Sequence, residues 1–125
     1  MLVGIDIIDI ERIKAVVERT PRFLYRIFTK GELEYCFSKN DPYPSLAVRF
    51  AAREAVRKLD PVFTSGILFQ DIEVYTHGDG RPELKLHGAA LEKCRQHGIS
   101  ELSISLSHSK TQAVAAVIAK KEVIE

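Results

Sequence analysis

The hydrophobic pattern of this chain changes period near its midpoint, and that change restricts the folds open to it. Residues 2–8 are rich in β-branched side chains and predict a strand. Residues 10–59 predict a series of helices separated by short turns. From residue 71 onward apolar and polar side chains alternate, which is typical of half-exposed strands. The order predicts an α+β fold in which helices pack on a small antiparallel sheet made largely of hairpins.

Local motifs predict where several elements begin and end. Thr29 followed three residues later by Glu32 is a capping-box pattern and predicts the start of a helix. After a loop at residues 38–44, Ser45 is expected to cap the longest, central helix over residues 46–59. The other expected elements are a helix at residues 10–19, a short helical piece after residue 20, turns at 77–82 and 108–112, a helix at 89–97 closed by Gly98, and a strand at 113–119.

Composition limits the class of protein. The chain has 125 residues, 46% of them hydrophobic, so we expect a single domain over residues 1–125 that would gain from self-association. A net charge of only +1 argues against nucleic acid as the main partner. Asp6 and Asp9 interrupt the apolar start too early for a signal peptide or a membrane span. We therefore expect a cytoplasmic protein with no membrane partner. Cys36 and Cys94 have no CxxC partner and are expected to be reduced, apolar packing residues.

Asp6 breaks the pattern of the first predicted strand. By alternation it shares a face with Gly4 and Ile8, so we expect it to be partly shielded from water. A shielded carboxylate needs a cation or several hydrogen-bond donors. It either caps a neighbouring backbone or pairs with an arginine, or it binds a metal ion.

The long predicted helix carries a second group of charges. Glu54 and Lys58 are four residues apart and Arg57 is three from Glu54, so all three project from one side. Glu54 with Lys58 is also an ordinary surface pair, and spacing alone favours that interpretation. A strand carboxylate combined with a helix carboxylate would nevertheless suit magnesium, which accepts two hard oxygen ligands and leaves its other positions to water and phosphate.

A third unusual segment is residues 105–110, where His108 lies among serines in a predicted turn. Such a histidine is either solvated or in contact with a phosphate or an adenine. The sequence contains no P-loop, no Rossmann glycine fingerprint and no Cys₂His₂-type zinc spacing.

Taken together, these segments resemble a known family. GIDIIDIERI at residues 4–13, RFAAREAVRK at 49–58, GRP at 80–82 and SLSHSKTQAVA at 105–115 are similar, in this order, to motifs of the holo-acyl-carrier-protein synthases. These are the short, single-domain phosphopantetheinyl transferases. The resemblance implies their fold and their reaction, in which the 4′-phosphopantetheine arm of coenzyme A is transferred to a serine of an apo acyl carrier protein and adenosine 3′,5′-bisphosphate is released, as part of fatty acid biosynthesis.

The resemblance also implies roles for individual residues. Asp6 and Glu54 would hold Mg²⁺, Lys58 would lie near the reacting phosphates, and Glu54 is the candidate base for the serine hydroxyl. The expected coenzyme A contacts are Arg53, Lys58, Gly80, Arg81, Pro82 and His108, and the expected docking surface for the acidic carrier helix is Arg12, Arg19, Arg22 and Arg26. The smaller members of the family are homotrimers with active sites at subunit contacts, and a homotrimer is expected here.

Two departures from the family pattern affect coenzyme A binding. Arg53 replaces a lysine, and an arginine fork does not substitute for a point charge at every site. Residues 60–66 replace a glycine-threonine-glycine turn and contain a single glycine. Two other functions stay open from sequence: a magnesium-dependent hydrolase of coenzyme A or another pyrophosphate, and a non-catalytic module that binds coenzyme A or a carrier protein.

Overall fold

The computed structural model of the chain describes residues 1–123. Its helices and strands, in chain order, are β1 (Leu2–Asp9), α1 (Ile10–Arg19), α2 (Arg22–Ile27), α3 (Lys30–Phe37), α4 (Tyr43–Arg57), β2 (Ile72–Thr76), β3 (Pro82–Leu86), α5 (Gly88–His97), β4 (Ile99–His108) and β5 (Gln112–Lys121). Two 3₁₀ turns, η1 (Pro61–Phe63) and η2 (Phe69–Asp71), connect α4 to β2. Within the described residues, no helix has the length and apolar character needed to cross a membrane.

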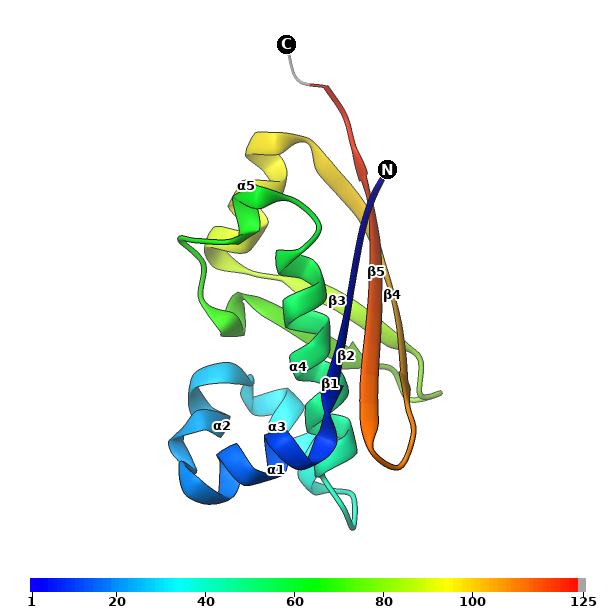
Figure 1. Cartoon of the computed structure of the whole chain (residues 1–125). Coiled ribbons are helices and arrows are strands. Elements are labelled where there is room, and N and C mark those ends of the chain that lie inside the picture. Colours follow the sequence, from blue (N-terminus) through cyan, green and yellow to red (C-terminus); the bar gives the residue numbers. More distant parts are fainter. Residues whose placement is uncertain (124–125) are drawn as a thin grey trace.

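The strands form two separate antiparallel sheets. The larger sheet has the strand order β1-β5-β4, so the N-terminal strand pairs with the C-terminal one, and β2 and β3 form a two-stranded hairpin. Helix α4 runs through the middle of the molecule, against β1 and β5, and the helices α1–α3 gather at one end of it (Figure 1). The α+β architecture with one long central helix is therefore confirmed, although the division of the strands into two sheets was not foreseen.

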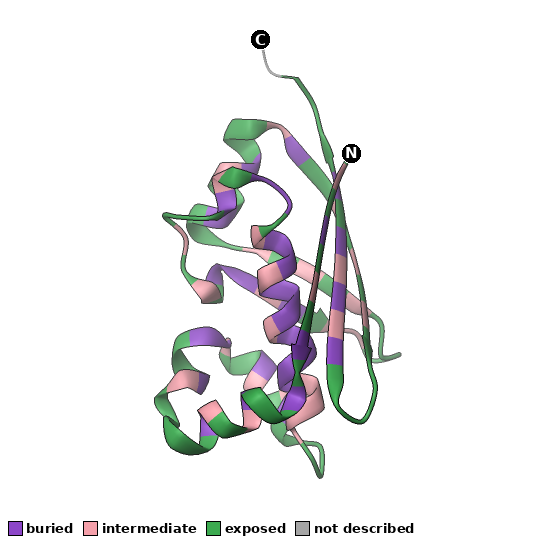
Figure 2. Cartoon of the chain, in the orientation of Figure 1, coloured by how far each residue is buried: buried purple, intermediate pink, exposed green. Residues whose placement is uncertain are grey.

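The core lies between α4 and the larger sheet, where the side chains on both sides are small. Ala51 and Ala55 of α4 are completely buried, as are Ala113 and Ala115 of β5. Figure 2 shows the buried positions following α4 through most of its length and alternating along β5. Small side chains allow a helix to lie close to a sheet, so the polar groups of α4 and β1 come within reach of each other.

Several predicted boundaries are confirmed by their local chemistry. The side chain of Thr29 accepts a hydrogen bond from Glu32 N, and the Glu32 side chain accepts one from Thr29 N, which completes the capping box. Gly98 ends α5 in the left-handed conformation with φ of 67°. Cys36 and Cys94 are free and buried, as expected.

The predicted start of the long helix is wrong. Helix α4 begins at Tyr43, before Ser45, and ends at Arg57. Proline in the first turn of a helix loses no hydrogen bond and already has a helical φ, so Pro44 is accommodated inside α4. Asp41 accepts a hydrogen bond from Tyr43 N through its side chain and holds the chain at this point.

Candidate active site

The site depends on a close contact between β1 and α4. Gly4 is buried, and a Cβ atom at this position would lie only 1.9 Å from the carbonyl oxygen of Ala55. The strand backbone therefore packs directly on the helix backbone. Side chains alternate along a strand, so Asp6 faces the same way as Gly4, toward the last turn of α4.

Asp6 receives its countercharge from that last turn. Lys58 Nζ lies 2.8 Å from Asp6 Oδ1 and also donates a hydrogen bond to the carbonyl oxygen of Ile5 at 3.2 Å. The Asp6 side chain is only 17% exposed, which confirms the predicted shielding, whereas Lys58 is 55% exposed. The carboxylate is thus enclosed and the ammonium group approaches it from the solvent side.

Glu54 has a different partner from the one its spacing favoured. Its Oε1 atom lies 3.8 Å from Arg57 Nη1, at the i,i+3 spacing, and its side chain is about one third exposed. Lys58 is directed to β1 instead of to Glu54. Each of the two acidic side chains, Asp6 and Glu54, is therefore balanced by a separate cation from the end of α4.

The same two carboxylates are the predicted metal ligands. Among residues 1–123, His, Cys, Asp and Glu side chains do not gather in groups of three or more, so the described part of the chain contains no all-protein metal cage. Magnesium is commonly bound by one or two carboxylates, with water and substrate phosphates completing the shell. Asp6 and Glu54 supply oxygen ligands only, and they fit an ion bound in that way.

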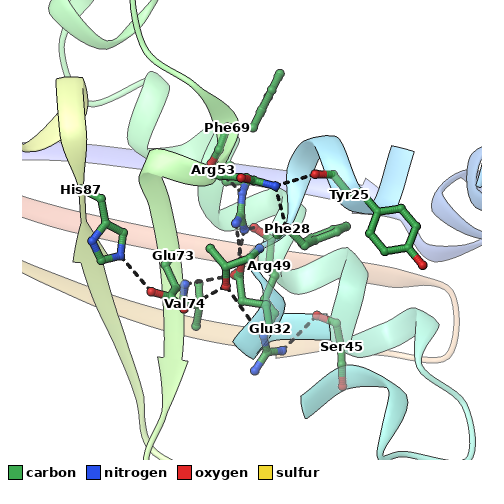
Figure 3. A network of polar contacts seen from close by, with 12 residues as sticks. Tyr25, Phe28, Glu32, Ser45, Arg49, Arg53, Phe69, Glu73, Val74 and His87 are labelled. Carbon is green, nitrogen blue, oxygen red and sulfur yellow. Dashed lines mark hydrogen bonds and ion pairs between the residues drawn. The ribbon is translucent and has the colours of Figure 1, made fainter. Parts of the chain in front are cut away.

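Arg53, also on α4, lies inside the protein. Its guanidinium group forms an ion pair with Glu32, and it donates hydrogen bonds to the carbonyl oxygens of Phe69 and Arg49 at 3.0 and 3.2 Å (Figure 3). Arg53 and Glu32 are fully buried. Glu32 also accepts a hydrogen bond from Val74 N at 3.1 Å, so this pair links α3, α4 and β2. The predicted contact between Arg53 and coenzyme A gains no support from this position.

Cys36 lies beside the buried pair. Burial raises the pKa of its thiol to about 11, against a smaller lowering effect of Arg49. The thiol is therefore protonated at neutral pH, and nothing in its surroundings activates it as a nucleophile.

The remaining predicted coenzyme A contacts lie on two hairpin ends. Gly80 and Arg81 belong to the turn between β2 and β3, and Pro82 begins β3. His108 ends β4, is exposed, and its Nδ1 atom lies 3.1 Å from the carbonyl oxygen of Ser109. It lines a shallow hollow of about 250 Å³ together with Ile7 of β1. The hydrogen bonds that Arg81 and His108 form are local, and none of them reaches Asp6 or Glu54.

The four predicted docking arginines all lie on the first two helices. Arg12 and Arg19 are on α1, and Arg22 and Arg26 are on α2, and all four are exposed. Sequence reasoning did not foresee a hollow of about 620 Å³ beside two of them, Arg22 and Arg26; its other lining residues are Val16, Thr20, Phe23, Tyr25, Ile27, Phe50 and Phe69. The sequence does not predict this hollow, because its aromatic side chains, among them Phe50 and Phe69, come from different segments of the chain.

Comparison with known proteins defines the class to which this fold and site belong. Residues 2–118 match the 4′-phosphopantetheinyl transferase superfamily. The chain is 49% identical over 116 residues to a holo-[acyl-carrier-protein] synthase of Carboxydothermus hydrogenoformans, covering 92% of this chain and 94% of the relative. The chain belongs to the 4′-phosphopantetheinyl transferase superfamily.

Solved structures show which members of the superfamily the chain resembles in its fold. The chain superimposes on the ACPS-CoA complex of Chronobacterium ammoniagenes with a TM-score of 0.85 and 25% identity, covering 98% of both chains. It also superimposes on the Helicobacter pylori holo-[acyl-carrier-protein] synthase in complex with coenzyme A, with a TM-score of 0.78 and 31% identity, covering 95% of this chain and 100% of the other. Within the superfamily, the relatives it resembles are the holo-[acyl-carrier-protein] synthases.

Proposed function

We propose that the chain is a holo-[acyl-carrier-protein] synthase, which transfers the 4′-phosphopantetheine arm of coenzyme A to a serine of an apo acyl carrier protein and releases adenosine 3′,5′-bisphosphate. The relatives named above, over nearly the full length of the chain, support this reaction and a place for it in fatty acid biosynthesis. The observation that carries it within this molecule is the pairing of Asp6 with Lys58, one helical turn from Glu54.

Asp6 and Glu54 would hold magnesium, which would supply positive charge to offset the negative charge that develops on the pyrophosphate of coenzyme A. Lys58, on the solvent side of Asp6, would turn to the phosphate oxygens and offset their charge or protonate the leaving group. Glu54, directly or through one water, would accept the proton of the carrier serine. The protein would position the two substrates and offset their negative charge, which are the main requirements of phosphoryl-type transfers.

Coenzyme A contacts are proposed for Lys58, for the hairpin residues Gly80, Arg81 and Pro82, and for His108. The hollow beside His108 is bordered by Ile7, which belongs to an exposed apolar row on β1. A neighbouring subunit on that row would bring a second chain close to His108. We therefore place the complete coenzyme A site at a subunit contact, and Arg53 is left out of it because its guanidinium is enclosed.

The same row supports the proposed homotrimer. Val3, Ile5 and Ile7 on the outer face of β1 are each more than half exposed, and Ile118 of β5 lies directly opposite Val3. Solitary exposed apolar residues are common, but a contiguous row on a sheet face marks an association surface. The molar mass of the chain in solution tests this assembly.

Carrier docking is proposed at the surface made by Arg12, Arg19, Arg22 and Arg26 on α1 and α2, which includes the hollow lined by Arg22 and Arg26. Its arginines would attract an acidic helix, and the aromatic lining would accept apolar side chains from that helix. A cytoplasmic location is proposed with this function, because coenzyme A and the carrier protein are its substrates.

One assay tests the proposal. The chain is incubated with coenzyme A, magnesium and an apo acyl carrier protein, and the carrier is weighed by mass spectrometry. A gain of one phosphopantetheine arm is expected. Free adenosine 3′,5′-bisphosphate with an unmodified carrier would indicate a hydrolase instead, and the absence of both products would indicate a binding module.

A further inference from the structure

Arg57 is held loosely at the end of α4. Its Nη1 atom is 3.8 Å from Glu54 Oε1, its Nη2 atom donates to the carbonyl oxygen of Thr64 at 3.3 Å, and its guanidinium lies 5.5 Å from the centre of the Phe69 ring. Both polar distances are long for charge-assisted hydrogen bonds, which are commonly 2.7–2.9 Å. A guanidinium has five N–H donors, so Arg57 keeps most of them for another acceptor.

The helix end and η1, next to Arg57, provide few hydrogen-bond donors for an anion. The end of a helix carries partial negative charge, and Arg57 and Lys58 form the end of α4. The following segment has no free amide over η1: Pro61 has none, Val62 N donates to Asp60 Oδ1 at 3.0 Å, and Phe63 N and Thr64 N donate to carbonyl oxygens at 3.1 Å. The amides of η1 are therefore not available to a phosphate at this end of α4, whereas the Arg57 side chain is.

Arg57 also borders a small cavity. It lines a hollow of about 210 Å³ with Thr64, Ser65, Ile67 and Phe69, between the end of α4 and η2. Glu54 and Lys58 lie within one turn of Arg57 on the same helix. We propose that Arg57, which faces Glu54, binds the pyrophosphate of coenzyme A next to Lys58. The proposal rests on the function proposed above and adds a specific cation to it.

Isothermal titration calorimetry with coenzyme A and magnesium tests the assignment. Arg57→Gln is expected to weaken coenzyme A binding roughly 10- to 100-fold, because charge-assisted hydrogen bonds to the phosphate are lost. Arg57→Lys is expected to restore part of the affinity. Arg95→Gln is the matched control, because Arg95 pairs with Glu92 at the same i,i+3 spacing on α5, at 3.9 Å. It should bind coenzyme A as the wild type does.

A second ligand shows which phosphate group of coenzyme A Arg57 contacts. With 3′-dephospho-coenzyme A the loss in Arg57→Gln should stay the same, because the pyrophosphate is retained. A loss that disappears with this ligand, or equal affinities of wild type and Arg57→Gln for coenzyme A, would overturn the assignment even if the wild type loads a carrier. A wild type that leaves the carrier unmodified overturns the proposed function itself, whatever the binding of the variants.

Discussion

Lys58 Nζ and Asp6 Oδ1 lie 2.8 Å apart across the contact of α4 with β1, although 52 positions separate the two residues in sequence. Glu54 is likewise paired with Arg57. If Asp6 and Glu54 hold a divalent ion as proposed, that ion must compete with these two cations, which then become available to phosphates. Metal and coenzyme A should therefore favour each other's binding.

The two carboxylates give the first prediction. Asp6→Asn and Glu54→Gln should each abolish magnesium-dependent transfer while the thermal midpoint stays close to that of the wild type, because both side chains lie at the edge of the core. Titration of magnesium in a calorimeter should show the loss of binding directly. Asp9→Asn is the control, since Asp9 is an exposed carboxylate on the same strand that accepts only from Gln112. Full transfer by either site variant would remove that residue from the metal site.

The docking surface gives the second prediction. Arg12→Glu or Arg22→Glu should lower kcat/KM for the carrier protein by roughly tenfold or more at low salt, through loss of electrostatic attraction. The same variants should flatten the dependence of the rate on ionic strength. Arg95→Glu, a charge reversal on the distant helix α5, provides the comparison. Identical salt profiles for Arg12→Glu and the wild type would contradict docking at this surface.

Gly4 gives the third prediction. An alanine there would place its Cβ 1.9 Å from a backbone oxygen that cannot rotate away, so β1 must shift. We expect Gly4→Ala to lower the free energy of unfolding by about 3 kcal/mol or more and to separate Asp6 from Lys58. In α3, a Cβ at Gly31 would meet Glu73 at an ordinary 3.5 Å, so Gly31→Ala should be neutral or stabilising by up to about 1 kcal/mol. Urea titrations of both variants measure the contrast.

The buried pair of Arg53 and Glu32 gives the fourth prediction. Glu32→Gln leaves the Arg53 charge enclosed without a countercharge, and this should reduce the free energy of unfolding by about 3–5 kcal/mol. Arg53→Met should be destabilising by a similar amount, because Glu32 is then the uncompensated charge. If Arg53 instead served mainly to bind coenzyme A, Arg53→Met would leave the urea midpoint unchanged and would lower only the affinity for coenzyme A.

Asp60 gives the fifth prediction, which concerns pH. A hydrogen bond from Lys121, 2.6 Å away, and a second from Val62 N lower the pKa of the Asp60 carboxyl in the folded protein. The unfolded chain therefore binds this proton at higher pH, near the ordinary value of about 3.9. The stabilisation is complete above that value and is lost as the pH falls toward the lower folded pKa.

We accordingly expect the stability difference between wild type and Asp60→Asn to be largest near neutral pH and to shrink below about pH 4. Urea unfolding from pH 7 down to pH 3 measures it, and Glu34→Gln, at an exposed position of α3, serves as the control. A difference that stays constant through this range would show that the carboxyl has no lowered pKa.

Local chemistry explains which parts of the fold could be predicted from sequence. The capping box at Thr29 and Glu32 and the left-handed end at Gly98 involve residues within one turn of each other, so the sequence contains the whole motif. The start of α4 was misplaced because proline was taken as a loop residue, although the first helical turn accepts it.

The candidate site contains contacts that could not be predicted from the sequence. Asp6 was recognised because a carboxylate contradicts its strand, and its shielding followed from alternation. Its cation could not be identified, because Lys58 becomes its partner only when Gly4 lets β1 touch α4. Arg53 has the same difficulty: nothing near it in sequence indicates that Glu32 will enclose it.

Strand β1 carries acidic chemistry on one face and an exposed apolar row on the other, in strict alternation. Inserting or deleting one residue between Ile7 and α1, which fixes the far end of the strand, would exchange the two faces, sending Ile5 and Ile7 inward and Asp6 outward. The proposed metal carboxylate and the proposed association surface would then be lost together, whereas a two-residue slip would preserve the alternation. Length changes in this strand are therefore far more restricted than substitutions.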